Sequence, residues 1–562
     1  MSLNEWQIWQ TYSTFFVEPI PDLDVAAQDM VRSGLVECAI IHDGTFYWLS
    51  GSTVERGQAS VKLSPDRMHG SVSVAPEVQN PYVMEALFEA FHLRFAEVRQ
   101  FGEEESLPPP YIRAFLGECR LASPEREILV YPVVKLHATG VVLLEMRIVS
   151  PDRELSLEEF VENYVNLYKW RFTEVWGPPG LALLYCRGFT YYQRHRWPIH
   201  LRAALLYLDR RNSIYVHNHT RAETSGDFEF GLAPLWKGPD DPHNQETRES
   251  NQRRVTGEGY SFTDLAQAII SATGIAISGL RRGLHLLVRG QRAPSELGNY
   301  WVARPHIHIT RQQGQMESAK ENEEKFRAAY GSIMGRIVGQ SADMGSRYLP
   351  ADARHSEDYG AYIAAQGTLW VWSQSGRRQE EPWALPNDSH LVYENQPKGE
   401  LLDYGYMLHR RVAATVGRLG SSGQVLRAQQ DLVELKMAMN EASVFGEIRE
   451  LLINGWHNMG VHQLQELIAE SLSIRRAQEA AAEEQRAVAW GVILTIAFGI
   501  LAVPMLATEV IERVWGLLGI WRPSDSNAAK LLFIGVALVL VMIVLSLSRR
   551  VLLRKQPRRS VR

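Results

Sequence analysis

Two uncharged, apolar segments near the C-terminus constrain the fold of this chain more than any other feature. Residues 487–508 carry no charge over 22 residues, and residues 531–548 carry none over 18. At about 1.5 Å of rise per residue, a helix of the first length reaches about 33 Å, enough for a hydrocarbon core of about 30 Å. The alternative is a pair of buried core helices. Because the two segments occur together and a basic tail follows them, the sequence predicts two transmembrane helices.

The distribution of basic residues predicts how these helices would be oriented. Residues 549–562 hold seven Arg and Lys residues and no acidic residue. The positive-inside rule places such a tail in the cytoplasm, and two crossings return the N-terminal region to the same side. The connector at residues 509–530 would then be extracytoplasmic. We therefore expect a multi-pass protein of the cell (inner) membrane, with the lipid bilayer as a partner and both termini cytoplasmic.

Residues 1–385 have the pattern of an α+β region. Two β-prone segments flank Asp43 and Gly44, a dipeptide that is a strong hairpin signal. Residues 81–101 are predicted to form a helix, because Asn80 suits the N-cap position and a proline follows it. Strands and helices mixed in this way are typical of α+β folds.

The same region is expected to be sensory or regulatory and to lie in the cytoplasm. A polar break near residues 220–259 indicates two subdomains. The cysteines, Cys38, Cys119 and Cys186, show no metal-binding spacing and fit reduced thiols. The region takes up well over half of the chain, more than a bare transporter requires. A ligand-binding region that controls the C-terminal part would account for its size.

Residues 390–486 are predicted to form a helical stalk. The segment is charged, and apolar residues such as Ile448 and Leu452 recur at helical spacing. Asn454 and Gly455 interrupt the pattern, so two antiparallel helices are expected, the second running into the first apolar segment. The predicted fold class is therefore an α+β cytoplasmic N-terminal region followed by a long helical stalk and two transmembrane helices.

Residues 403–411, the stalk from residue 426 to 486 and the two apolar segments resemble the C-terminal half of the CorA-like divalent-cation channel superfamily. The resemblance covers about residues 391–562. It implies a homo-oligomer, a pentamer by analogy, with the first span lining a pore and a divalent cation as the permeant ion or regulator. The family's Gly-Met-Asn signature is absent from the end of the first span, which argues against magnesium transport.

The first apolar segment contains a set of candidate pore-lining residues. Positions seven apart share one face of a helix, and this face ends in two acidic residues. Repeated by symmetry, these acids would form rings that favour cations. The alternative is that they mark the end of the helix in water. The candidate pore-lining residues are Thr495, Gly499, Ala502, Met505, Glu509 and Glu512.

Two His-x-His pairs are candidate metal ligands. They are His217 with His219, and His306 with His308. On a strand, residues two apart face the same side, which suits two ligands of one metal ion. No third ligand follows from the spacing, so structural histidines are the alternative. No phosphate-binding loop, nucleophile elbow, zinc-protease or dinucleotide motif occurs, so we expect no catalytic residues, no resident cofactor and no enzyme activity.

These observations lead to two functional hypotheses. The first is a CorA-like homo-oligomeric membrane channel or membrane effector, conducting cations and gated when its large cytoplasmic region binds a ligand. The alternative is a membrane-anchored enzyme or scaffold whose two helices serve only as a tether. The net charge of −5 gives no reason to expect nucleic acid as a partner.

Overall fold

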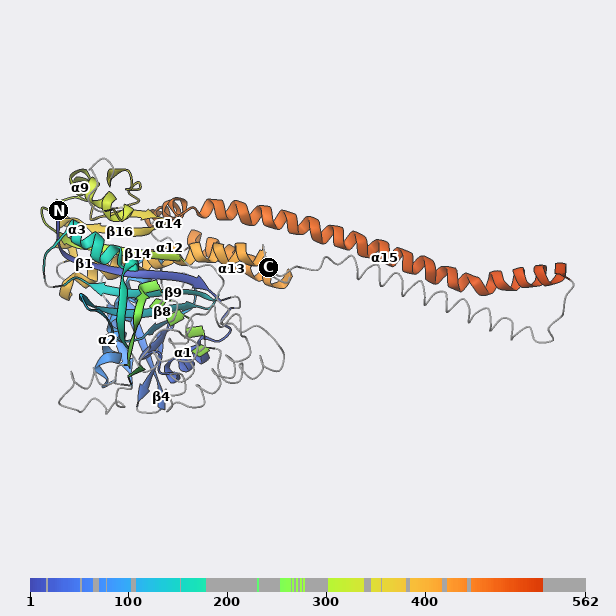
Figure 1. The fold of residues 1–562 in the computed structure, drawn as a ribbon, viewed down its shortest axis with the longest axis horizontal. Helices are drawn as coiled ribbons and strands as arrows, with labels where there is room; N and C mark the ends of the chain where they lie inside the picture. The colour runs from blue at the N-terminus through green and yellow to red at the C-terminus, as the bar shows by residue number, and fades with distance from the viewer. Residues whose placement is uncertain are drawn as a thin grey trace. The chain divides into compact units, whose positions relative to one another are not determined.

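The computed structural model describes most of the chain: residues 1–177, 230–231, 253–277 and 302–518, apart from short gaps within these ranges. The chain divides into two units, Met1–Ala469 and Glu470–Arg562. The first unit contains the described strands. The helix α15 (Val461–Leu518) begins in the first unit and continues into the second (Figure 1).

A mixed β-sheet forms the body of the first unit. Neighbouring strands along it pair antiparallel, except for the parallel pair β14 and β16. In spatial order the strands are β15 (Tyr359–Ala364), β16 (Gly367–Trp372), β14 (Val302–Gln312), β1 (Ser2–Phe15), β9 (Val141–Val149), β8 (Arg126–His137), β6 (Tyr111–Phe115), β2 (Cys38–Ile41), β3 (Thr45–Ser50), β4 (Thr53–Leu63) and β5 (Gly70–Ala75). Strands that pair beside this path are β7 (Cys119–Ser123), β10 (Leu155–Ser156), β11 (Arg171–Gly177), β12 (Phe230–Gly231) and β13 (Arg253–Ser261).

The helices lie between and after these strands in the sequence. Those in the first 180 residues are α1 (Leu23–Arg32), α2 (Pro81–Phe101), α3 (Leu157–Phe160), the π-helical turn η1 (Val161–Val165) and the 3₁₀ turn η2 (Leu167–Lys169). Those that follow are α9 (Ala319–Gly335), α11 (Gln374–Glu380), the 3₁₀ turn η5 (Pro386–Asp388), α12 (Ser389–Ala414), α13 (Ser422–Glu441), α14 (Gly446–Asn458) and α15.

Two local predictions are confirmed because short-range hydrogen bonds determine them. The Asp43 carboxylate accepts from the backbone N–H of Thr45 at 2.8 Å, in the turn that joins β2 to β3. Gly44 has a φ of +87°, which a glycine adopts without strain. At the start of α2, the Asn80 side chain accepts from the backbone N–H of Tyr82 at 3.0 Å.

Different parts of the chain pack on the two faces of the sheet. Trp6 and Ile8 of β1 join a large apolar core on one face. On the opposite face, Trp9 clusters with Leu93 of α2 and Val392 of α12. Because successive residues of a strand point to opposite faces, Trp9 lies on the other side of the sheet from its neighbour Ile8. The helices α2 and α12 therefore cover this second face.

The prediction of transmembrane helices is wrong within the described residues. Residues 487–508 form part of α15, which carries exposed charged side chains such as Glu483 and Arg486. A span requires about 20 consecutive apolar residues. Across the part of the chain that the structure describes, no helix combines the length and the apolar character needed to cross a membrane. This finding overturns the predicted fold class in its membrane part, the inner-membrane location and the membrane channel. Residues 531–548 lie outside the described residues.

The helices after residue 385 also differ from the predicted antiparallel pair. Asn454 and Gly455 lie inside α14 instead of interrupting the stalk. The chain turns at Gly460, whose φ is +79°. Gly455 is helical because its missing side chain leaves room for α12: a Cβ at this position would lie 2.7 Å from Leu402 Cδ2. Tertiary packing therefore outweighs the low helix propensity of glycine at this position.

Candidate functional site

The structure describes one of the two predicted histidine pairs. His306 and His308 lie on β14 and are fully buried, whereas His217 and His219 lie outside the described residues. Within the described part of the chain, no group of three or more His, Cys, Asp or Glu side chains is placed to hold a metal ion. The pair instead contacts α12, where His308 Nε2 lies 3.0 Å from Gln396 Oε1.

The predicted pore-lining residues all lie on α15. Thr495 is exposed, and its hydroxyl donates to the backbone carbonyl of Gly491 at 2.8 Å. A pore role for this set depended on a membrane-crossing helix, which the described residues do not contain. The rest of the set continues the same helix: Gly499, Ala502, Met505, Glu509 and Glu512.

A buried charged surface occupies the face of the sheet beneath α12. The strand register places Arg113 of β6 opposite Lys135 of β8. Glu145 lies on the next strand, β9, opposite Val133 of β8. Because alternate residues of a strand share a face, all three charged side chains point to the same side. Each is at most 1% exposed, although charged side chains are rarely buried unless they are paired.

The facing polar groups come from α12. Gln396, Glu400 and Asp403 recur at spacings of four and three, which places them on one face of the helix. All three are at most 1% exposed. Lys398 is also buried, and its ammonium group donates to the hydroxyl of Tyr359 on β15 at 3.0 Å. The middle of α12 is therefore polar on the side that meets the sheet.

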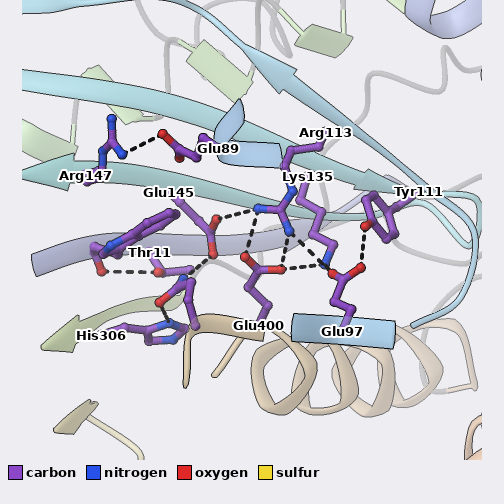
Figure 2. A network of polar contacts seen from close by, with 12 residues as sticks. Thr11, Glu89, Glu97, Tyr111, Arg113, Lys135, Glu145, Arg147, His306 and Glu400 are labelled. Carbon is purple, nitrogen blue, oxygen red and sulfur yellow. Dashed lines mark hydrogen bonds and ion pairs between the residues drawn. The ribbon is translucent and has the colours of Figure 1, made fainter. Parts of the chain in front are cut away.

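The centre of the site is a network of ion pairs, which Figure 2 shows between two helices and the sheet. Arg113 donates to both carboxylate oxygens of Glu400, at 2.9 and 2.7 Å. Lys135 donates to Glu97 of α2 at 2.8 Å and also to Glu400. The Tyr111 hydroxyl donates to Glu97 at 2.6 Å. Strands β6 and β8 therefore both contact Glu97 of α2 and Glu400 of α12.

Nearby charges decide which of these carboxyl groups are ionised. Burial opposes ionisation of Glu97, but Lys135 and the neighbouring arginines outweigh it and lower the pKa of Glu97 to about 2. Burial is likewise outweighed at Glu400, where Arg113 and Lys135 lower the pKa. Burial and the negative charge of Glu400 hold the pKa of Glu145 well above its usual range. These shifts favour the ionised forms of Glu97 and Glu400 and the protonated form of Glu145.

A second polar cluster joins the first through Gln396. Gln396 Nε2 lies 2.8 Å from Glu145 Oε1, and Gln396 Oε1 lies 3.3 Å from His306 Nδ1. His306 Nε2 lies 2.9 Å from Asp403 Oδ2, and Asp403 forms an ion pair with Arg304. Burial holds the pKa of His306 well below its usual range, and the positive charge of Arg304 adds to this effect.

Further ion pairs connect α2 to the sheet and to α12. Arg147 of β9 lies 2.6 Å from Glu89 of α2, a pair that Figure 2 shows beside the central network. Arg99 near the end of α2 pairs with Glu394 of α12. The Gln100 side chain donates to the backbone carbonyl of Glu394 at 2.6 Å. These contacts fix the position of α12 along α2 as well as over the strands.

The remaining sides of α12 contact the helices that follow it. Trp456 of α14 donates from its indole nitrogen to the backbone carbonyl of Leu402 at 3.1 Å. The same indole packs so closely on Gly405 that a Cβ there would lie 2.0 Å from Trp456 Cζ2. Arg411 pairs with Asp431 of α13 at 2.8 Å.

A contact with α15 completes this side of α12. His409 Nδ1 lies 2.7 Å from the carbonyl oxygen of Gly405, so this nitrogen carries the proton and donates it. His409 Nε2 is then an acceptor for the side-chain amide of Gln465, 3.1 Å away on α15. α12 thus bonds to the sheet on one side and to three later helices on the others.

The chemistry available to this network follows from its burial. The carboxyl groups of Glu97, Glu145 and Glu400 are at most 1% exposed, so a dissolved substrate does not reach them in this conformation. The network holds α12 in one position over the sheet through ion pairs and hydrogen bonds.

Comparisons with protein-family models, curated proteins and solved structures find no match for this chain. The resemblance to the CorA-like superfamily therefore stays a prediction.

Sequence reasoning missed almost all of the buried network. The signal that could have found it is one charged residue inside an otherwise apolar, β-prone segment, as with Arg113, Lys135 and Glu145. Such a residue normally marks the solvent-facing side of a strand. A second signal was the short polar series in α12 that includes Gln396 and Asp403.

Proposed function

We propose that the protein is a regulatory protein in which α12 couples the sheet of the first unit to the helices that follow it. The observation that carries the proposal is the two-sided bonding of α12. One side takes part in the buried ionic network through Glu400 and Asp403. The other sides contact α13, α14 and the start of α15 through Arg411, Trp456 and Gln465.

The energetics of buried charges support this role. An apolar interface of similar volume is often as stable as a buried ion-pair network or more so, so stability alone does not explain the charges. A buried network instead specifies one register, because a small displacement of α12 leaves several charges unpaired at once. The helix is therefore expected to have discrete positions instead of a continuous range. A ligand or partner that favours one position would shift the population toward it.

Transmission through α12 predicts a specific effect of Glu97→Gln. The substitution removes a carboxylate from α2 that contacts Lys135 but none of the later helices. Loss of that charge weakens the hold of the network on α12. We expect the backbone amides of α12, α13 and α14 to exchange with deuterium at least about tenfold faster, as for a loss of about 1.4 kcal/mol in local stability. Hydrogen–deuterium exchange read by mass spectrometry measures this directly.

Glu85→Gln is the matched control, because Glu85 lies on the same helix and is exposed. Its exchange pattern should equal that of the wild type. Faster exchange in α12 alone, with α13 and α14 unchanged, would show that α12 anchors the sheet without transmitting to the later helices. Uniformly faster exchange over the whole first unit would also contradict the proposal.

Self-association is part of the proposed function, and α13 offers a surface for it. Leu426, Val433 and Met437 are 67%, 53% and 54% exposed. Their spacings of seven and four place them in one stripe on α13, opposite its buried side. An apolar stripe on a helix is stabilised when a second helix covers it. We propose that a second copy of this chain supplies that helix.

Replacing Val433 and Met437 together by glutamine is expected to weaken self-association about 100-fold. Removing two buried apolar side chains from an interface costs about 3 kcal/mol, which corresponds to that factor. Sedimentation velocity over a concentration series measures the change. Lys436→Gln is the control, since Lys436 is exposed beside the stripe. A wild-type protein that stays monomeric at all concentrations would contradict this part of the proposal.

A further inference from the structure

The carboxamide of Gln396 occupies a position that makes two hydrogen-bonding arrangements possible. One end of the amide faces Glu145 at 2.8 Å. The other end faces His306 Nδ1 at 3.3 Å and His308 Nε2 at 3.0 Å. The far nitrogen of His306 faces Asp403 at 2.9 Å. An amide oxygen and nitrogen are nearly equal in size, so Gln396 fits this space in either orientation.

With its oxygen toward the histidines, Gln396 favours charged neighbours. The amide nitrogen then donates to Glu145, which accepts most strongly as an ionised carboxylate and no longer has to hold a proton. Both histidines must donate to the amide oxygen. His306 must also donate to Asp403 from its other nitrogen, so it carries both protons and a positive charge. In this arrangement an imidazolium–carboxylate ion pair connects β14 to α12.

With its nitrogen toward the histidines, Gln396 requires neutral neighbours. The two amide hydrogens donate to His306 Nδ1 and His308 Nε2. His306 then keeps a single proton, on the nitrogen that donates to Asp403. The amide oxygen accepts from Glu145, which must be a protonated carboxyl group. The number of protons is the same in both arrangements, because the one on Glu145 replaces the one lost from His306.

The net charge around the site is the same in both arrangements. The groups that face Glu145 are Arg113 of β6, Lys135 of β8 and Glu400 of α12. Arg304 of β14 and Asp403 of α12 face His306, and Glu97 of α2 completes the cluster through Lys135. Among the fully buried side chains, the cations Arg113, Lys135 and Arg304 face the carboxylates of Glu97, Glu400 and Asp403, and the partly exposed Arg94 also pairs with Glu97. Ionising Glu145 and His306 adds one charge of each sign, so the two arrangements have the same net charge.

We propose that Gln396 is a two-position amide switch that places a shared proton on Glu145 in one position and on His306 in the other. In the first position neutral hydrogen bonds hold α12 on β14, and in the second an ion pair does. The inference deepens the proposed coupling role of α12 and rests on it for its biological meaning. Burial stabilises the neutral arrangement, since it raises the pKa of Glu145 and lowers that of His306.

The location of the proton can be measured on the full chain at pH 7. We expect ¹⁵N spectra of labelled histidine to show His306 as a neutral imidazole with its proton on Nε2. Infrared spectra should contain the carbonyl band of a protonated carboxyl group that Glu145→Gln removes and Glu85→Gln leaves in place. Gln396→Glu tests the switch itself. The new carboxylate accepts only, so both nitrogens of His306 should become protonated.

Linkage to stability gives an independent measurement. The raised pKa of Glu145 means that the folded protein keeps a proton that the unfolded chain loses above about pH 4.5. Stability conferred by this proton is complete below that pH and falls as the pH rises toward the folded-state pKa. Above about pH 4.5, the unfolding constant of the wild type should therefore rise with pH relative to that of Glu145→Gln, until the pH passes the raised pKa of Glu145 in the folded protein.

Each outcome decides for or against the inference. A wild-type protein in which Glu145 is protonated while His306 is an imidazolium, or in which Glu145 is ionised while His306 is neutral, would overturn it. It would also be overturned if His306 stayed neutral in a folded Gln396→Glu variant. Hydrogen exchange in Glu97→Gln tests the coupling role without reference to the proton. If the proton measurements contradict the switch while Glu97→Gln speeds exchange in α13 and α14, the coupling role stands and only the switch is refuted.

Discussion

Replacing Glu400 by leucine is expected to lower the free energy of unfolding by about 3–5 kcal/mol, the usual cost of removing one partner from a buried ion pair. Glu400 accepts two hydrogen bonds from Arg113 and one from Lys135, and all three side chains are buried. Without the carboxylate, two cations remain in the interior, and the acidic side chains left beside them are Glu97 and Glu145. Urea denaturation followed by circular dichroism measures the loss.

The matched double variant separates charge balance from packing. Lys135→Met removes one cation, so in combination with Glu400→Leu it leaves Arg113 facing Glu97 at 3.5 Å. We expect the double variant to be more stable than the sum of the two single changes by about 1–3 kcal/mol, the usual coupling between residues in contact. Additive losses would mean that Lys135 and Glu400 contribute independently, and would contradict the ion pair between them.

The second large effect is expected where α12 meets α14. Trp456→Ala should cost about 3–5 kcal/mol, because it leaves a cavity at a side chain that is 7% exposed. Gly405→Val should cost about 1–3 kcal/mol, because its side chain would overlap the indole of Trp456. In the combined variant the added side chain fills part of the cavity. Its loss should therefore be smaller than the sum of the two.

A second glycine provides the control for this test. Gly423 lies on α13, and a Cβ there would meet nothing within 4 Å. Gly423→Val should therefore change stability little, by at most about 0.5 kcal/mol. If Gly405→Val were equally harmless, the close contact between α12 and α14 would not contribute to stability, and thermal denaturation would show it.

The features that the sequence predicted correctly are decided within a few residues. The hairpin at Asp43 and Gly44 depends on a side chain that bonds two residues on and on a backbone conformation that glycine permits. The start of α2 depends on Asn80 capping the amide two residues later. Neither interaction requires knowledge of the rest of the chain.

The buried network could not be derived in this way, because its partners lie far apart in the sequence. Arg113 and Glu400 are separated by 287 positions. An isolated charge in a β-prone segment is normally a solvent-facing residue. Whether such a residue is exposed or buried depends on which helix covers it, and that is a property of the tertiary fold.

The same limit applies to two other interpretations of the sequence, the histidine pair and the first apolar segment. His306 and His308 do share one side of a strand, but that side meets α12, so their partners are Gln396 and Asp403. The apolar segment at residues 487–508 was interpreted from length and composition. The structure instead places it in the long helix α15, and no helix among the described residues meets the requirements of a membrane span.

The sequence by itself determined the local elements of this protein: the β2–β3 turn, the boundaries of α2 and the helical character of α12 to α15. These depend on caps, turns and propensities that act over a few residues. Only the tertiary structure decided that a charged side of the sheet is buried and that α12 covers it. The physical reason is that a charge tolerates burial only when opposite charges are brought to it, and here those charges come from distant parts of the chain.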